Sequence, residues 1–244
     1  MKAIGKKVLI GFLMVVLVLV GGFAWYVMDD YDANEVALQA LNSTEKVEVN
    51  GEDPIQFSPQ GASSEVGIIF YPGGKVEEEA YAPLMQALAE EGYSVFLVDM
   101  PFGLAVLDVN AAEEIMAEHS EISEWYLAGH SLGGAMAALF AENNASKLAG
   151  LILLASYSTA DLSESGLSVL SILGSEDQVM DSDKIAEYRP MLPSDAVEVV
   201  ISGGNHAQFG SYGFQTGDGS ATITAFEQQV RTVEEMLDFI EMNQ

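Results

Sequence analysis

The sequence contains no cysteine. This absence excludes disulfide bonds, a thiol nucleophile, iron–sulfur clusters and zinc sites with cysteine ligands. Histidine is also scarce: with three in the chain, a metal centre built from histidine alone would need all of them. The acidic triplet at residues 181–183 (Asp-Ser-Asp) is typical of a helix start rather than a metal site. We therefore expect neither a metal ion nor another cofactor.

Basic residues are few, with 9 Lys and Arg against 37 Asp and Glu, and the formal net charge is −28. Nucleic-acid-binding proteins hold phosphates with clusters of Lys and Arg, so this composition argues against a nucleic-acid partner. An acidic surface of this kind is well solvated and repels polyanions. The 244 residues are 49% hydrophobic, which is enough to build the core of one α/β domain.

The N-terminal region has no charged residue from Val8 to Met28. A helix of this length spans about 30 Å, the hydrocarbon thickness of a bilayer. Lysines precede the run and aspartates follow it, which predicts that the N-terminal end stays in the cytoplasm. Trp25 and Tyr26 stand at the outer end, where aromatic side chains favour the membrane interface.

We predict that residues 1–28 form a single-pass membrane anchor, residues 29–44 a linker with a short helix, and residues 45–244 one domain. The domain would lie on the extracytoplasmic side of the cell membrane. The alternative is a cleaved signal peptide, because residues 22–24 (Gly-Phe-Ala) form an acceptable cleavage site, and the domain would then be secreted. The length of the apolar run and its aromatic end favour the retained anchor.

The rest of the chain alternates between strand-like and helical patterns. A predicted hairpin, Lys46–Asn50 with Ile55–Ser58, comes first. The apolar runs that follow are 66–71, 93–98, 125–128, 148–154, 167–173 and 196–201, and the helical patterns are 77–91, 109–119, 132–143 and 221–242. Strands buried on both faces have continuous apolar runs, and their alternation with helices implies parallel pairing. We predict an α/β fold with a doubly wound, mostly parallel sheet.

The strongest motif is Gly-His-Ser-Leu-Gly-Gly at residues 129–134. It follows a predicted strand directly and opens a predicted helix. In this context a G-x-S-x-G sequence forms a sharp turn that exposes the serine hydroxyl, and the glycines avoid steric clashes. The helix N-terminus favours developing negative charge. The motif predicts Ser131 as a nucleophile.

A serine nucleophile needs a base that removes its proton. His206 lies on a loop after the last predicted strand, from which it can reach the carboxyl edge of the sheet where Ser131 is expected. His130 belongs to the turn itself, so its side chain diverges from that of Ser131. His119 ends an acidic helical stretch and is expected to be solvated.

The acid that orients the base is expected between serine and histidine in the sequence, at the end of a strand. Asp177 meets both conditions and would hold the imidazole in the required tautomer. Glu176 and then Asp161 are the alternatives. When the serine attacks a carbonyl group, negative charge develops on the carbonyl oxygen. Two backbone N–H groups are expected to stabilise this oxyanion.

The first oxyanion donor is the N–H of Leu132, which follows the nucleophile. The second comes from the loop at residues 71–76 (Tyr-Pro-Gly-Gly-Lys-Val), where Pro72 offers no donor. We expect this second donor to be the N–H of Gly73 or Gly74, because a glycine allows the backbone to approach a substrate oxygen closely. The N–H of Lys75 is the further alternative.

These segments resemble serine hydrolases of the α/β-hydrolase superfamily, and more narrowly the small, cap-less branch that includes dienelactone-hydrolase-like proteins. The matching segments are Tyr-Pro-Gly-Gly at 71–74, Gly-His-Ser-Leu-Gly-Gly at 129–134, Gly-Ser-Glu-Asp at 174–177 and Gly-Asn-His at 204–206. The resemblance runs from about Val66 to the C-terminus and implies a Ser131–Asp177–His206 triad acting on acyl esters. Dienelactone hydrolases proper use a cysteine nucleophile, which this chain lacks.

Two segments bear on the substrate. Residues 155–166 are too short for a cap domain between two predicted strands, so we expect an open site for small or flexible acyl groups. The glycine-rich loop 209–219 follows His206 and either supplies aromatic walls or packs on itself. The predicted function is hydrolysis of a small-molecule ester by an acyl-enzyme mechanism. The alternatives are an amidase, peptidase or thioesterase with the same triad, or a membrane-displayed binding module without activity.

Overall fold

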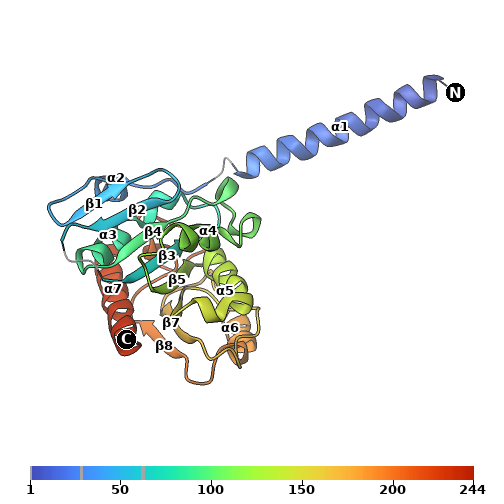
Figure 1. Cartoon of the computed structure of the whole chain (residues 1–244). Coiled ribbons are helices and arrows are strands. Elements are labelled where there is room, and N and C mark those ends of the chain that lie inside the picture. Colours follow the sequence, from blue (N-terminus) through green and yellow to red (C-terminus); the bar gives the residue numbers. More distant parts are fainter. Residues whose placement is uncertain (1, 28–29, 62–63) are drawn as a thin grey trace. The chain divides into compact units, whose positions relative to one another are not determined.

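The computed structural model describes residues 2–27, 30–61 and 64–244, and within the first range it describes the side chains of residues 9–23 and 26. The chain divides into two compact units, residues 1–30 and residues 31–244. Figure 1 shows the course of the chain through both units.

The first unit contains helix α1 (Lys2–Val27). Large hydrophobic side chains along it are exposed, among them those of Phe12, Leu17 and Val18. Among the described residues, we find no helix with both the length and the hydrophobicity needed to cross a bilayer. The side chains of the predicted lysine flank and of Trp25, and residues 28–29, lie outside the described residues. The membrane anchor therefore stays a prediction.

The second unit is built on one sheet with the strand order β1-β2-β4-β3-β5-β6-β7-β8. The strands are β1 (Val47–Asn50), β2 (Ile55–Pro59), β3 (Val66–Tyr71), β4 (Ser94–Leu97), β5 (Glu124–His130), β6 (Gly150–Leu154), β7 (Ser168–Gly174) and β8 (Val197–Ile201). The β1–β2 and β2–β4 pairs are antiparallel, and the remaining pairs are parallel. The mostly parallel sheet is confirmed, and the predicted hairpin extends one edge of it.

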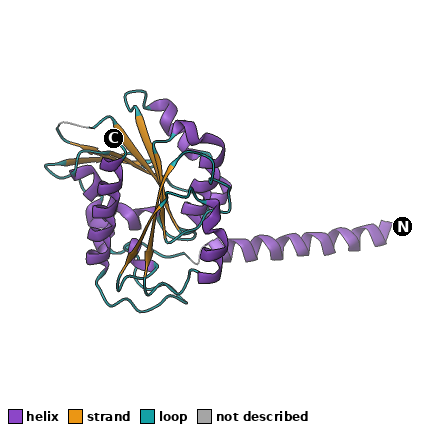
Figure 2. Ribbon diagram, turned by 90° about the horizontal axis from the view of Figure 1, so that it is seen from below, coloured by secondary structure: helices purple, strands orange, loops and turns teal. Residues whose placement is uncertain are grey.

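Helices cover both faces of the sheet, as Figure 2 shows. The helices of this unit are α2 (Glu35–Ala40), α3 (Ala82–Glu90), α4 (Ala111–Glu118), α5 (Leu132–Asn144), α6 (Ser182–Tyr188) and α7 (Ala225–Met242). Side chains of β3 alternate between the two faces, as the period of a strand requires. Ile68 packs in the core beneath α3 and α7, whereas Ile69 packs in the core beneath α4 and α5. The carboxyl ends of the parallel strands therefore meet at one edge between two helical layers.

Acidic side chains gather around Glu78, in the short 3₁₀ turn Glu78–Tyr81 before α3. Partial burial, together with the negative charges of Glu79, Asp99 and Glu77, raises the pKa of Glu78 to about 7. The folded state therefore binds the Glu78 proton more tightly than the unfolded state does, and the bound proton stabilises the fold. This contribution to stability is complete below the unfolded pKa of about 4.5 and is lost as the pH rises through about 7.

We expect Glu78→Gln to raise the melting temperature at pH 8, because the glutamine side chain carries no charge in this acidic surrounding. The gain should be smaller at pH 4.5, where Glu78 is protonated in the folded protein. Thermal unfolding at the two pH values measures the difference. The matched control Glu234→Gln removes an exposed carboxylate of α7, and an equal gain in this variant would contradict the prediction.

Candidate active site

Ser131 lies in a strained turn between β5 and α5, with φ 51° and ψ −119°. Positive φ is unfavourable for a residue with a Cβ and persists where neighbouring contacts enforce it. Here the Ser131 N–H donates to the Leu154 carbonyl at 2.9 Å, and the Ser156 hydroxyl donates to the Ser131 carbonyl at 2.8 Å. The strand-to-helix turn is therefore the one that the serine motif predicts.

The glycines of the motif are required by close packing of backbone on backbone. A Cβ at Gly133 would overlap the carbonyl oxygens of Tyr71 and Pro72, at the end of β3. A Cβ at Gly129 would lie 2.6 Å from backbone atoms of Gly133 and Gly134. The first turn of α5 thus lies directly on the loop that follows β3.

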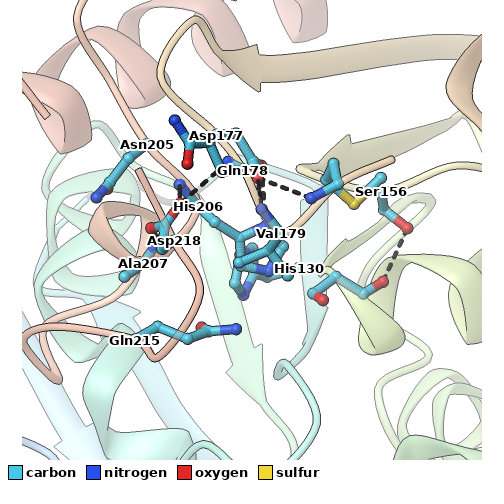
Figure 3. Close-up of polar contacts among 12 residues, drawn as sticks. His130, Ser156, Asp177, Gln178, Val179, Asn205, His206, Ala207, Gln215 and Asp218 are labelled. Atoms are coloured by element: carbon cyan, nitrogen blue, oxygen red, sulfur yellow. Dashed lines mark hydrogen bonds and ion pairs between the residues drawn. The ribbon is translucent and has the colours of Figure 1, made fainter. Parts of the chain in front are cut away.

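Asp177 and His206 meet at the carboxyl edge of the sheet, from the loops after β7 and β8. The His206 Nδ1 lies 2.9 Å from the Asp177 Oδ2, and the two side chains are 1% and 3% exposed. Because a carboxylate only accepts, the Nδ1 carries a proton, and in a neutral imidazole the Nε2 is then an acceptor. Figure 3 shows the pair and its neighbours.

The second oxygen of Asp177 holds its own loop. The Asp177 Oδ1 accepts the N–H groups of Val179 and Met180, each at 2.9 Å. The two carboxylate oxygens therefore have separate roles: the Oδ2 pairs with the histidine and the Oδ1 fixes the segment that follows the acid. This arrangement restrains the rotation of the carboxylate.

His206 lies beside the serine turn. Its ring centroid is 4.5 Å from that of His130, the residue before Ser131. The His206 Nε2 is buried and has no hydrogen-bond partner among the described residues. Asp177 and His206 are thus in contact, but no hydrogen bond joins the His206 Nε2 to the Ser131 hydroxyl. Such bonds are often long in a free enzyme and shorten when substrate binds.

Asp218 is a functional candidate that the sequence analysis missed. Its buried carboxylate accepts the N–H groups of His206 at 3.3 Å and Ala207 at 2.9 Å, and that of Gln178 at 3.4 Å (Figure 3). Asp218 therefore joins the loop after β7, which carries Asp177 (the loop of the acid), to the loop after β8, which carries His206 (the histidine loop). An aspartate between two glycines has no specific sequence signal, so only the fold reveals this role.

Buried glutamines of α7 hold the histidine loop from the other side. Gln228 forms two hydrogen bonds with the backbone of Asn205, at 2.8 and 2.9 Å. Gln229 donates to the carbonyl of Gly210 at 3.1 Å. In the loop 209–219, Phe209 and Tyr212 are buried in the core and Phe214 is exposed, and none of the three lines the cavity of about 380 Å³ that lies beside Ser131. The loop packs on the domain rather than supplying aromatic walls to that cavity.

His130 is buried against Tyr81. The Tyr81 hydroxyl lies 2.8 Å from the His130 Nδ1 and accepts the N–H of Gly73 at 3.0 Å. Burial, and then the neighbouring His206, holds the pKa of His130 well below its usual range. The Tyr81 hydroxyl therefore donates a hydrogen bond to the Nδ1 of the neutral His130. This network links the serine turn to the loop after β3.

The same network distinguishes the candidate oxyanion donors. The Gly73 N–H is bound to Tyr81, and the Lys75 N–H donates to the Gly103 carbonyl at 2.9 Å. Within the described residues, the Gly74 N–H has no hydrogen-bond acceptor. A Cβ at Gly74 would lie 3.0 Å from the Leu132 side chain, so the two segments are in contact. The geometry favours the N–H groups of Gly74 and Leu132.

We expect Tyr81→Phe to lower the free energy of unfolding by about 2–4 kcal/mol, because it leaves the His130 Nδ1 and the Gly73 N–H buried without partners. Urea unfolding monitored by circular dichroism measures the loss. The control Tyr212→Phe removes one hydroxyl that donates to Gln215 in a partly buried contact. An equal loss in both variants would argue against a special role for the buried network.

A cavity of about 380 Å³ lies beside Ser131. Its walls come from α5, from the loop after β6 and from the loop of the acid. The lining residues are Ser131, Leu132, Ala135, Met136, Ser156, Tyr157, Thr159, Val179, Met180 and Asp181. Residues 155–167 contain no helix or strand, so this segment forms no cap domain.

The described residues contain no group of three or more acidic or histidine side chains arranged to hold a metal ion. Asp181 begins α6, as predicted, because its carboxylate accepts the N–H groups of Asp183 and Lys184. Glu176 contacts the Ser175 hydroxyl, and Asp161 contacts the Ser163 hydroxyl. Neither of these two acids has a hydrogen bond to His206, so Asp177 is the acid that the geometry favours.

The fold and the serine turn are those of the α/β hydrolases. The model of the alpha/beta hydrolase family matches residues 67–230, and the chain belongs to this family. The predicted superfamily is therefore confirmed. Membership of this family supports the prediction that the protein is a hydrolase. No curated protein matches the sequence.

Solved structures share the fold at low sequence identity. A membrane phospholipase A described as a bacterial virulence factor is 15% identical, with 98% of this chain and 99% of that chain covered and a TM-score of 0.60. A predicted CIB-like hydrolase from Thermoplasma acidophilum is 15% identical (78% and 98% covered, TM-score 0.56). Esterase 2 of Thermogutta terrifontis, phosphorylated by paraoxon, is 16% identical (81% and 95% covered, TM-score 0.56).

Proposed function

We propose that the domain hydrolyses small carboxylic esters with Ser131 as nucleophile, His206 as general base and Asp177 as the orienting acid. The observation that carries the proposal is the buried hydrogen bond between His206 and Asp177, placed beside the strained turn of Ser131. A hydroxyl is a weak nucleophile until an adjacent base removes its proton. The pair supplies such a base beside the turn that carries Ser131.

In the proposed mechanism the Ser131 hydroxyl attacks the ester carbonyl while the His206 Nε2 takes its proton. The N–H groups of Leu132 and Gly74 stabilise the oxyanion, and Asp177 stabilises the imidazolium. His206 then protonates the leaving alkoxide and activates water, which releases the acid from Ser131. No step requires a metal ion or a cofactor.

An amidase, peptidase or thioesterase could use the same groups, and a binding module could have kept the fold without turnover. The presence of all three triad residue types argues against the binding module. The short segment 155–166 leaves the site open, which suits small or flexible esters. Comparison of matched ester, thioester and amide substrates separates the enzymatic alternatives.

A fluorophosphonate probe tests the activation of the nucleophile directly, because the serine must attack phosphorus to be labelled. We expect the purified protein to be labelled at Ser131, as mapped by peptide mass spectrometry, and Ser131→Ala to remain unlabelled. Heat-denatured protein is the control for nonspecific labelling. Absence of labelling in the folded protein would favour the binding module.

We also propose that residues 1–28 anchor the domain to the cell membrane, on its extracytoplasmic side. The proposal rests on the uncharged run from Val8 to Met28 and on its charge asymmetry. The full-length protein should sediment with membranes and resist carbonate extraction. A mature form that begins near Trp25 and appears in the medium would support secretion after cleavage instead.

A further inference from the structure

We propose that the cavity beside Ser131 binds the acyl group of the ester and selects an uncharged, mainly aliphatic chain of up to about eight carbons. This inference rests on the proposed ester hydrolysis and specifies its substrate class. It is carried by the chemistry of the cavity walls, by the position of the cavity relative to His206 and by its volume.

The walls are mainly apolar and come from two sides. Helix α5 contributes Leu132, Ala135 and Met136, and the loop of the acid contributes Val179 and Met180. Methionine side chains are flexible and pack well against alkyl chains of different shape. The polar lining groups come from the loop after β6 and from the start of α6.

The position of the cavity assigns it to the acyl side of the ester. The leaving alkoxide must reach the His206 Nε2 to receive its proton, so the alcohol part lies on the histidine side. Ser131 lines the cavity, whereas His206 and Asp177 do not. The group that extends from the carbonyl carbon away from the histidine is the acyl chain.

The volume limits the length of that chain. At about 380 Å³ the cavity is at the lower end of the range for small-molecule sites. A water-sized group such as a methylene occupies roughly 30 Å³, and an open cavity is not completely filled. The cavity therefore accommodates a chain of about six to eight carbons. Longer chains would extend into solvent and gain little further binding.

The charge of the lining disfavours acyl groups that carry a carboxylate. Asp181 is the acidic member of the lining set, and this set includes no lysine, arginine or histidine. The nearby Lys184 forms an ion pair with Glu187 at 2.7 Å. A carboxylate on the acyl chain would therefore lie near a negative charge without a cation to balance it.

A chain-length series tests the size limit. We expect kcat/KM for p-nitrophenyl esters to rise about fourfold per methylene from acetate to hexanoate, since each buried methylene strengthens binding, and to stop rising by laurate. Met136→Trp fills the cavity and should move the optimum to acetate. Leu139→Trp, an exposed position of the same helix outside the lining, is the matched control.

A second series tests the assignment to the acyl side. Alkyl acetates from methyl to hexyl vary the alcohol and keep the acyl group constant, so Met136→Trp should not change their profile. Val179→Phe provides a second filling variant at a partly exposed wall position if Met136→Trp does not fold. A change confined to the alcohol series, or equal acyl profiles for Met136→Trp and Leu139→Trp, would overturn the proposal.

The charge preference is tested with the mono-p-nitrophenyl ester of adipic acid against p-nitrophenyl hexanoate. We expect the wild type to prefer hexanoate at least tenfold. Asp181→Asn keeps the acceptor that caps α6 and should raise the relative rate for adipate about fivefold, because it removes the repelling charge. Asp183→Asn, which does not line the cavity, should leave the ratio unchanged; equal use of both esters by the wild type would overturn the proposal.

The two proposals fail in different ways. If Ser131 is not labelled by the fluorophosphonate and no ester is hydrolysed, the proposed function fails. If Ser131 is labelled and esters are hydrolysed, but the filling variants leave acyl selectivity unchanged, only the acyl-site assignment fails.

Discussion

Ser131→Ala is expected to reduce kcat for p-nitrophenyl butyrate by at least about 10⁴-fold, because the variant cannot form an acyl-enzyme. The melting temperature should not fall, since the Ser131 hydroxyl forms no hydrogen bond among the described residues and its loss leaves no buried partner unsatisfied. Steady-state kinetics and thermal unfolding of the purified protein measure the two effects.

The matched control is Ser156→Ala. This variant removes the hydroxyl that donates to the Ser131 carbonyl, so it should lower the melting temperature and reduce the rate far less. Unchanged turnover in Ser131→Ala would refute the assignment of the nucleophile. A large loss of stability in that variant would mean that the serine has a structural role.

Asp177→Asn is expected to lower kcat by about 10³–10⁴-fold while the protein stays folded. The amide can still accept the N–H groups of Val179 and Met180 through its oxygen, but it presents an NH₂ group to the His206 Nδ1. The histidine must then accept at the Nδ1 and carry its proton on the Nε2, so it cannot take the proton of Ser131.

Asp177→Ala separates the two roles of the carboxylate. It should lose the same activity and also lower the melting temperature, because the loop of Val179 and Met180 loses its acceptor. Glu176→Gln is the matched control, since Glu176 is the neighbouring acid and its carboxylate accepts the Ser175 hydroxyl rather than His206. A loss of rate in Glu176→Gln equal to that in Asp177→Asn would reassign the acid.

Much of the fold follows from the sequence because the signals are local. The run 66–71 predicts β3 with its observed ends, since a strand buried on both faces is apolar throughout. The last helix begins at Ala225, four residues later than predicted, because Thr224 and Glu227 form a capping box that fixes its start. The motif Thr-x-x-Glu was present in the sequence and would have given this boundary.

The supporting contacts of the site could not be predicted in this way. Tyr81 meets His130 across 49 positions of sequence, and Asp218 meets Gln178 across 40. Such pairs depend on the packing of whole elements, and a single tyrosine or aspartate carries no signal of its partner. The choice between Gly73 and Gly74 likewise depended on which N–H group the Tyr81 hydroxyl already binds.

Asp177 contacts His206 with one carboxylate oxygen and holds the cavity wall at Val179 and Met180 with the other. This double role limits how substrate preference can change in this hydrolase. Insertions or deletions at residues 178–180 would alter the cavity wall and, through the Oδ1, also displace the carboxylate that pairs with His206. Mutations on α5 carry no such coupling to the acid. Directed evolution toward bulkier esters should therefore accumulate changes at Met136 and leave the segment after Asp177 intact.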